Sequence, residues 1–249
     1  GKSSLVNALL GRNEHIVTPV AGTTRDSVGT RYQAYGFDML LVDTAGLRRK
    51  ARVSDNVEFY STIRTVRAIQ EANVCALMLD ATQGMEAQDL AILSLIERHK
   101  KGVVILVNKW DLAPKEKNAD VEMRKVIEER LLPLQGVPIL FISAKDKLRL
   151  HKTLEVLQRT FEEGRRRVPT RELNDALLPL IQATPPPSAR GKLVRIKFVS
   201  QGEGACPTFL LFSNHPKDIK DPYKRFLEGK IREHFGFQGW PIQIFAREK

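Results

Sequence analysis

The sequence predicts an α/β domain, with a parallel sheet flanked by helices, followed by a small α+β domain. Between residues 74 and 161, apolar runs of strand length alternate with segments of helical period. This alternation is typical of a parallel sheet that helices cover on both faces. After residue 169 the pattern changes to the order helix, strand, strand, helix, strand. The expected domains are residues 1–164 and 165–249, joined by a basic linker at 164–169.

The first part of the chain should contain a helix, a hairpin and two loops. The helix is predicted at residues 3–10 and ends at Gly11, a common helix stop. Residues 12–27 show no period and contain Pro19 and Gly22, so we expect a loop. Residues 32–38 are typical of a hairpin that leads into a buried strand at 39–42. A second, basic loop is expected at 47–57, and a helix at 59–69.

Strands and helices then alternate. The predicted strands are 74–79, 103–107 and 138–142, and the predicted helices are 87–100, 121–132 and 150–161. Ligands of such sheets bind beyond the carboxyl ends of the strands. Asp43, Asn108 and Ser143 each directly follow an apolar strand, so all three should lie on that edge. The first strand of this sheet is expected upstream of Gly1.

The smaller domain begins with a helix predicted at 173–183, which three consecutive prolines end. Strands are expected at 194–198, where Arg195 and Lys197 form one basic face, at 209–212 and at 242–245. Between the last two strands, one apolar face of a helix is formed by Tyr223, Leu227, Ile231 and Phe235.

The segment Gly1-Lys2-Ser3 matches the end of a phosphate-binding loop, G-x-x-x-x-G-K-[S/T], whose front half would lie upstream. A helix that starts here points its N–H groups and the positive end of its dipole at a phosphate. Lys2 would reach the β- and γ-phosphates, and the Ser3 hydroxyl would bind Mg²⁺. Ser4 lies in the same first turn and belongs to the expected site.

A second segment, Asp43-Thr44-Ala45-Gly46, follows a strand and fits the same phosphate site. Asp43 would hold Mg²⁺ through water, and the Gly46 N–H would contact the γ-phosphate, so that the next loop senses hydrolysis. In the preceding loop Thr23 or Thr24 could close on Mg²⁺, and we favour Thr24. The expected catalytic residues are therefore Lys2, Thr24 and Gly46, and the expected Mg²⁺ ligands are Ser3, Thr24 and Asp43.

Leu47 follows this segment, at the position where Ras-like enzymes place a water-orienting glutamine. A leucine side chain cannot orient water, so hydrolysis without help should be slow. A cation, a partner or another side chain could assist. Arg25, Arg48 and Arg49 are candidates, although loop arginines are more often simply solvated.

The most specific segment is Asn108-Lys109-Trp110-Asp111. The Asp111 carboxylate would accept two hydrogen bonds, from the N1–H and the 2-amino group of guanine. Adenine has neither donor, and an unpaired buried carboxylate is costly, so Asp111 would select GTP over ATP. Lys109 would lie over the base, and in Ser143-Ala144-Lys145 the Ala144 N–H would meet the guanine oxygen. The complete expected nucleotide site is Gly1, Lys2, Ser3, Ser4, Asp43, Thr44, Ala45, Gly46, Leu47, Asn108, Lys109, Trp110, Asp111, Ser143, Ala144 and Lys145.

The chain has 249 residues and a net charge of +11, most of it near the C-terminus. Residues 165–249 hold 16 Lys and Arg against 8 Asp and Glu, a net charge of +8. This excess indicates an anionic partner such as RNA, or simply a solvated basic face. No apolar run approaches the ~20 residues of a membrane span. The two cysteines form no disulfide framework, which favours a reducing cytosol.

Several of these stretches together resemble a known family. Residues 21–26 (Ala-Gly-Thr-Thr-Arg-Asp), 43–47 and 108–111 are similar to the TrmE–Era branch of translation GTPases. Residues 57–65, 184–187 (Thr-Pro-Pro-Pro) and 223–228 look like Der, also called EngA, the bacterial GTPase family with two tandem G domains and a C-terminal KH-like domain. The similarity covers nearly the whole chain, which would correspond to the second G domain, from the middle of its phosphate loop, and the KH-like domain. Ala21 stands where relatives usually have proline, which changes loop stiffness more than chemistry.

The resemblance implies a P-loop GTPase that acts as a switch in assembly of the large ribosomal subunit. It also implies contact with ribosomal RNA, a cytoplasmic location, and hydrolysis that potassium stimulates. The potassium-binding asparagine of the family would lie upstream of Gly1. We expect a monomer that binds GTP or GDP with Mg²⁺ and has no membrane partner. TrmE itself fits less well, because it ends in a cysteine motif and this chain ends Ala-Arg-Glu-Lys.

Two functions stay open at this point. The first is a GTP-hydrolysing switch, and the second is a nucleotide-regulated ribosome- or RNA-docking module with negligible intrinsic hydrolysis. Leu47 keeps the second interpretation open.

Residues 236–239 (Gly-Phe-Gln-Gly) match the Gly-x-x-Gly with which KH domains clamp RNA. This stretch follows a predicted helix and precedes a strand, so we expect a helix cap and a turn, and Era, whose KH domain carries a true loop of this kind, is the less similar relative. Phosphate contacts from basic side chains are the better candidates for RNA binding. These side chains are Arg195, Lys197, Lys224, Arg225 and Arg232.

Overall fold

The computed structural model describes residues 1–11, 16–21, 28–42, 65–113, 116–131, 134–188, 191 and 193–248. By its internal contacts the chain divides into two units, Gly1–Leu132 with Pro138–Gln158, and Pro133–Val137 with Arg159–Lys249. The domain boundary predicted between residues 164 and 165 stays a prediction.

The first unit contains the predicted parallel sheet. Its strands are β4 (Val74–Asp80), β5 (Gly102–Asn108) and β6 (Ile139–Phe141), hydrogen-bonded in the order β4-β5-β6. All seven residues of β5 are buried, as expected for a central strand covered on both faces. The predicted strands and the α/β class are confirmed.

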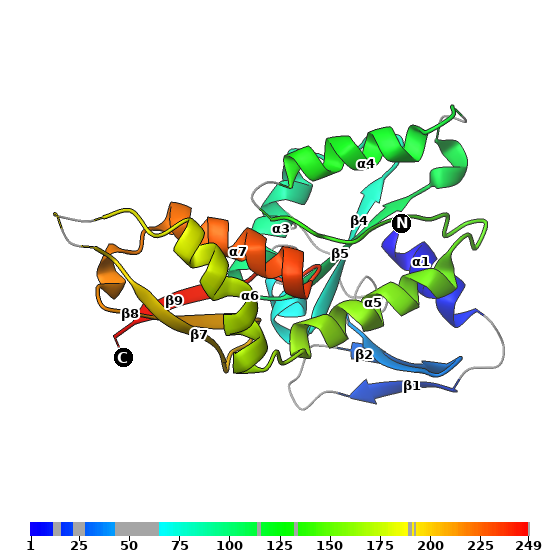
Figure 1. The fold of residues 1–249 in the computed structure, drawn as a ribbon. Coiled ribbons are helices and arrows are strands. Elements are labelled where there is room, and N and C mark those ends of the chain that lie inside the picture. Colours follow the sequence, from blue (N-terminus) through cyan, green and yellow to red (C-terminus); the bar gives the residue numbers. More distant parts are fainter. Residues whose placement is uncertain are drawn as a thin grey trace, which may run out of the picture. The chain divides into compact units, whose positions relative to one another are not determined.

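Helices flank this sheet on both sides, and in Figure 1 α4 and α5 lie on opposite sides of β4 and β5. The flanking helices are α1 (Lys2–Leu10), α3 (Ala87–Arg98), α4 (Ala119–Arg130) and α5 (Leu150–Arg165). The helix expected at 59–69 is described only from residue 65, and residues 65–71 are helical with Ile69 buried. The loop expected at 47–57 lies outside the described residues.

A separate antiparallel sheet of the first unit is formed by β1 (Ile16–Ala21), β2 (Val28–Ala34) and β3 (Phe37–Leu41). Tyr35 and Gly36 join β2 to β3 with φ of +50° and +81°, as in a two-residue type I′ hairpin turn. The predicted hairpin is confirmed.

Two expectations for this region were wrong. Residues 12–27 are not a continuous loop, because 16–21 form β1, where β-branched residues surround Pro19. A proline is tolerated there because β1 is an edge strand of its sheet. The strand near 39–42 is not buried on both faces, since Leu40 is 54% exposed.

One apolar core joins the two sheets of the first unit. Leu5 and Leu9 of α1 pack with Tyr32 and Phe37 of the antiparallel sheet. The same cluster includes Val104, Leu106, Ile142, Ala144, Leu150 and Leu154. The N-terminal turn of α1 is thereby held close to the carboxyl ends of β5 and β6.

The second unit is an α+β domain with the predicted element order. It consists of α6 (Thr170–Ala183), β7 (Ile196–Gly202), β8 (Thr208–Ser213), α7 (Asp221–Phe235) and β9 (Gln243–Arg247). β7 pairs antiparallel with β8, and β8 pairs parallel with β9.

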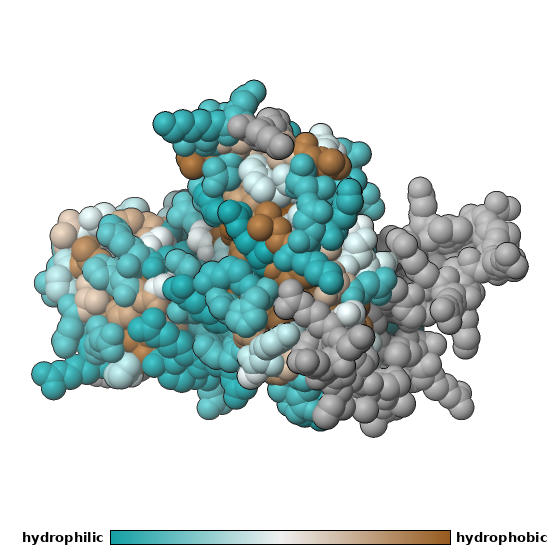
Figure 2. Space-filling view, turned by 90° about the vertical axis from the view of Figure 1, so that its right-hand side faces the viewer, coloured by the Kyte–Doolittle hydropathy of each residue, from teal (hydrophilic) through white to brown (hydrophobic). Residues whose placement is uncertain are grey.

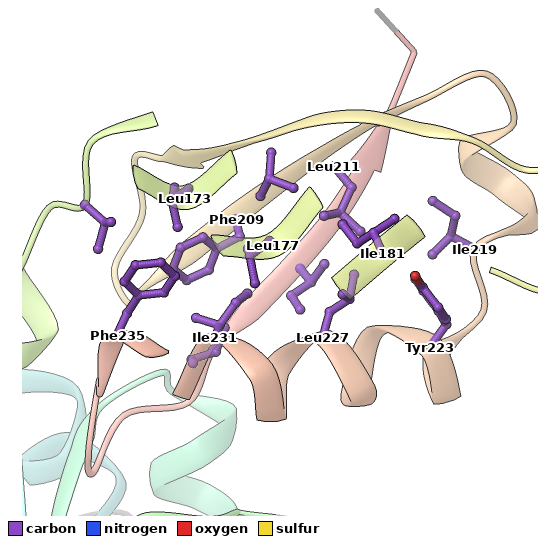
Figure 3. Packing of buried hydrophobic residues seen from close by; sticks show 14 of the residues in the cluster. Leu173, Leu177, Ile181, Phe209, Leu211, Ile219, Tyr223, Leu227, Ile231 and Phe235 are labelled. Carbon is purple, nitrogen blue, oxygen red and sulfur yellow. The ribbon is translucent and has the colours of Figure 1, made fainter. Parts of the chain in front are cut away.

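The core of the second unit lies between its sheet and its two helices. Tyr223, Leu227, Ile231 and Phe235 are all buried, which confirms the apolar helix face read from the sequence. Figure 3 shows these side chains of α7 directed toward those of α6 and β8. This face of the sheet is therefore covered.

The linker expected at residues 164–169 is more structured than predicted. α5 continues to Arg165, and Val168 is buried in the core of the second unit. The Gln201 side chain accepts a hydrogen bond from the Val168 N–H at 2.8 Å and donates one to the Arg166 carbonyl at 2.9 Å. These contacts fasten the segment, and a charge-rich composition did not indicate them.

Among the described residues, no helix is both long and apolar enough to cross a membrane. The face drawn in Figure 2 is mostly hydrophilic, with hydrophobic residues in small areas between hydrophilic ones.

Candidate nucleotide site

The N-terminus of α1 presents backbone N–H donors that the helix itself does not use. Gly1 caps the helix without a side-chain hydrogen bond, and its carbonyl accepts the Leu5 N–H at 3.0 Å. The N–H groups of the first helical turn, at Lys2, Ser3 and Ser4, have no partner within the helix. No acidic residue lies in this turn, so its positive dipole end is not neutralised locally.

Asn108 connects three of the predicted segments. It ends β5 and is only 5% exposed. Its Oδ1 accepts the Ala144 N–H at 3.0 Å, and its Nδ2 would lie 3.1 Å from a Cβ added at Gly1. The end of the phosphate loop, the β5 edge and the loop after β6 thus meet around one buried amide.

Lys109 is oriented by a carboxylate that the sequence reasoning did not include. Lys109 adopts a left-handed backbone with φ of +63°, and its Nζ forms an ion pair with Asp80. Asp80 ends β4 in register with Asn108 at the end of β5. The end-of-strand rule applied to Asn108 would also have found Asp80.

Asp80 is an acceptor for several donors. Its Oδ1 accepts the Thr82 hydroxyl at 2.7 Å and the Thr82 N–H at 3.0 Å. The hydrogen bond from Lys109, followed by those from Thr82, lowers the pKa of Asp80 from 3.8 to about 2. Asp80 is therefore ionised and able to hold Lys109 at any physiological pH.

This geometry predicts how Asp80 titrates. Because its pKa is depressed in the folded state, its contribution to stability is present above pH 3.8 and is lost as the pH falls toward 2. Thr82→Ala removes the hydroxyl donor and should raise the pKa of Asp80, measured by carboxyl ¹³C NMR. Gln83→Ala, which changes the exposed neighbouring side chain, should leave it unchanged. A pKa near 3.8 for Asp80 in the wild-type chain would contradict the hydrogen bonds that Lys109 and Thr82 donate to it.

Trp110 and Asp111 lie in a short 3-10 helix, Trp110–Leu112, directly after Lys109. The backbone N–H of Trp110 donates to the Ile142 carbonyl at 3.0 Å. The Trp110 ring packs against the Phe141 ring with centroids 4.4 Å apart. These contacts position Asp111. Its Oδ1 is buried, and within the described part of the chain it has no hydrogen-bond partner.

The loop after β6 is held by hydrogen bonds around Ser143. Ser143 is fully buried, its Oγ accepts the Asp146 N–H at 3.1 Å, and its carbonyl accepts the Leu148 N–H at 2.9 Å. The Ala144 N–H, expected to meet a guanine oxygen, donates to Asn108 in this structure. A base oxygen would have to share that donor or replace Asn108 as its acceptor. Lys145 is exposed.

The structure thus brings Gly1, Asn108 and Ala144 together. Lys109 and Asp111 follow Asn108 in the chain. The other described residues of the expected site are Lys2, Ser3, Ser4, Trp110, Ser143 and Lys145. The predicted residues Thr23, Thr24, Asp43, Thr44, Ala45, Gly46 and Leu47 lie outside the described residues. Of the expected Mg²⁺ ligands only Ser3 is described. Within the described parts of the chain, no three His, Cys, Asp or Glu side chains are grouped so that they could hold a metal ion.

The Gly-x-x-Gly stretch of the second unit is a helix cap and turn, as predicted. Gly236 ends α7 with φ of +83°, and its N–H donates to the Arg232 carbonyl. Phe237 is fully buried, and its N–H donates to the Glu163 carboxylate at 2.8 Å. These contacts use the backbone donors of Gly236 and Phe237, so the segment does not present the open loop with which KH domains clamp RNA.

Arg232 was wrongly included among the RNA candidates. Its guanidinium donates to the carbonyls of Phe237 and Trp240, at 3.0 and 2.6 Å, and to the Glu228 carboxylate at 2.9 Å. The side chain is only 9% exposed. Helical periodicity placed it off the apolar face but could not show that the next turn folds back over it. Arg195, Lys197 and Arg225 are exposed, and Lys224 is partly exposed.

Comparison with known proteins agrees with these two units. Residues 1–109 match the family model described as 50S ribosome-binding GTPase, and residues 167–247 match the C-terminal KH-domain-like model of EngA bacterial GTPase enzymes. The Era structure in complex with MgGDPNP and 16S ribosomal RNA covers the whole chain, and the chain covers 89% of it, at 22% identity and a TM-score of 0.50. The fold and site therefore define a P-loop GTPase domain followed by a KH-like domain.

The full-length relatives narrow this class further. The chain is 49% identical over its whole length to GTPase Der of Porphyromonas gingivalis and 51% identical to GTPase Der of Phocaeicola vulgatus. Over its whole length the chain is similar to the Der (EngA) family. The chain spans 57% of the length of these relatives.

Proposed function

We propose that this chain binds GTP and hydrolyses it to GDP, as a switch in the assembly of the large ribosomal subunit. The observation that carries the proposal is the buried Asp111 Oδ1, which has no partner in the described chain. A buried carboxylate oxygen is costly unless a donor reaches it. The N1–H and 2-amino group of guanine are such donors, and adenine offers neither.

The rest of the site supports the same ligand. Lys109, held by Asp80, lies next in the chain to the residues that would meet the base. The open N-terminus of α1 suits the phosphates, and Lys2 would neutralise the charge that develops on the β- and γ-phosphates. Asn108 accepts the Ala144 N–H and lies close to Gly1, so the proposed phosphate and base parts of the site are near each other.

Magnesium fits the Ser3 hydroxyl at the start of α1, with Thr24 and Asp43 as the further proposed ligands. The ion would neutralise phosphate charge during transfer. Era, which shares the fold, is known with MgGDPNP. Potassium is proposed as an activator because Leu47 cannot orient water.

The proposed partners are the large ribosomal subunit and its RNA. Relatives of the first unit are described as 50S ribosome-binding GTPases, and the excess positive charge of this chain lies in residues 165–249. A monomer in the cytoplasm, without a membrane partner, completes the proposal. A docking module with negligible turnover is the second candidate, and Leu47 is the observation that favours it.

The test is turnover of GTP and of ATP, each with potassium and with sodium. We expect turnover selective for GTP, faster in potassium, and at least about tenfold slower in Lys2→Ala because a phosphate contact is removed. Lys125→Ala removes an exposed lysine from α4 and should have no effect. GTP binding without turnover would favour the docking module, and equal use of ATP would contradict the site.

A further inference from the structure

We propose that the outer face of the β7-β8-β9 sheet binds single-stranded RNA by stacking bases on its aromatic side chains. This inference rests on the proposed RNA contact of the basic C-terminal domain and assigns that contact to one surface. It rests on the register of the sheet, on its stacked aromatic pair with the exposed Phe245 ring, and on its charge.

The sheet has two different faces. Val199, Phe209, Leu211 and Ile244 point into the core beneath α6 and α7. Side chains alternate along a strand, so their neighbours lie on the opposite face. The register places Phe198 beside Phe212 and Phe212 beside Arg247, and in the next row Ser200 beside Leu210 and Leu210 beside Phe245. We call these six residues the outer face.

The outer face presents flat aromatic surface. Phe198 and Phe212 stack with ring centroids 4.2 Å apart and planes inclined by 6°. Phe245 is 46% exposed, whereas the preceding Ile244 is 9% exposed. An exposed phenylalanine next to a stacked pair can extend the stack with a nucleobase. Aromatic rings on a sheet are the surface on which RRM domains stack two or three bases.

The charge of the outer face suits an anionic chain. Arg247 belongs to the outer face, and the three strands contain no Asp or Glu. Lys197 lies at the register shift between Ile196 and Phe198, where the alternation of side chains is interrupted. Lys197, Arg247 and the nearby Arg195 are all exposed. Aromatic surface with a cationic rim favours a ligand that combines flat bases with phosphates, over an apolar protein segment.

Two further observations favour single-stranded over double-stranded RNA, and the outer face over the helical side of the domain. In a duplex the base faces are already stacked on one another, so an exposed ring such as that of Phe245 can stack only on unpaired bases. The Gly-x-x-Gly stretch on the helical side is closed, because Phe237 is buried and its N–H is bound by Glu163. The domain therefore needs another surface to read RNA, and the outer face supplies one.

The experiment measures how tightly the whole chain binds a fluorescein-labelled, mixed-sequence RNA. The RNA has about ten nucleotides, a length within the site sizes of proteins that bind single strands. Phe245→Ala should weaken binding about tenfold, the loss of one stacked base, without changing the salt dependence. Phe245→Trp should keep the affinity, and its emission should be quenched by the RNA. Lys197→Ala should lower the salt dependence by about one phosphate contact. A duplex of the same sequence should bind more weakly.

Val126→Ala, which shortens an exposed apolar side chain on α4, is the control and should bind as wild type does. Unchanged affinity in Phe245→Ala together with weaker binding in Arg225→Ala would overturn the stacking face and leave the proposed RNA contact intact. Equal affinity for single and double strands would also overturn the stacking face. If the wild-type chain binds no RNA, both the stacking face and the proposed RNA contact of the C-terminal domain are overturned.

Discussion

Asp111→Asn is expected to lower the affinity for GTP by at least about a hundredfold and to raise the affinity for xanthosine triphosphate. The buried Asp111 Oδ1 has no partner among the described residues, so it can accept a hydrogen bond from an incoming donor. An asparagine would place an NH₂ group opposite the N1–H or 2-amino group of guanine, two donors facing each other. Xanthine carries a carbonyl oxygen at that position, which can accept from the new amide.

The measurement is competition of GTP, ATP and xanthosine triphosphate against a fluorescent guanine nucleotide. Asp120→Asn is the matched control, because it removes a carboxylate from the exposed first turn of the nearby helix α4. Asp120→Asn should keep the wild-type preference. If Asp111→Asn also keeps it, Asp111 does not read the base, and the nucleotide assignment of the site fails with it.

Gly164→Ala is expected to destabilise the second unit by about 3 kcal/mol, the upper part of the range for overpacking. Gly164 lies in the last turn of α5, where an added Cβ would overlap the Trp240 indole. The indole cannot easily move, because it is 5% exposed and its Nε1 donates to the Thr160 carbonyl at 2.5 Å. The methyl group would therefore separate α5 from the turn that follows α7.

Gly229→Ala is the matched control. Gly229 lies inside α7, and a Cβ added there would meet nothing within 4 Å. The change should stabilise the helix by about 0.5–1 kcal/mol, since alanine loses less backbone entropy than glycine. Urea unfolding followed by Trp240 emission, in a Trp110→Phe background, measures both variants. Equal stability of the two would show that Trp240 can give way. Recovery of stability in Gly164→Ala with Trp240→Leu, followed by far-UV circular dichroism because this variant has no Trp240 to emit, would confirm the steric cause.

The sequence by itself determined the kinds of elements and their order. Helical spacing identified the buried face of α7, and apolar runs identified β4, β5 and β6. Asn108 and Ser143 each directly follow one of these apolar runs, which placed both residues at the carboxyl edge of the sheet. These features could be predicted because periodicity is a local consequence of backbone geometry and of which side of an element is buried. The nucleotide segments were readable for a similar reason, since each is a short run of defined chemistry.

Only the tertiary structure decided which groups meet. It gave residues 16–21 a partner in β2, placed Asp80 against Lys109, and made Asn108 the link between Gly1 and Ala144. Within the second unit, it buried the Arg232 guanidinium against backbone carbonyls and bound the Phe237 N–H of the Gly-x-x-Gly stretch to Glu163. Local sequence shows that a side chain is polar or that a face is apolar. Its partner depends on packing between segments far apart in the chain, and that packing decides whether a cation binds RNA or caps a turn.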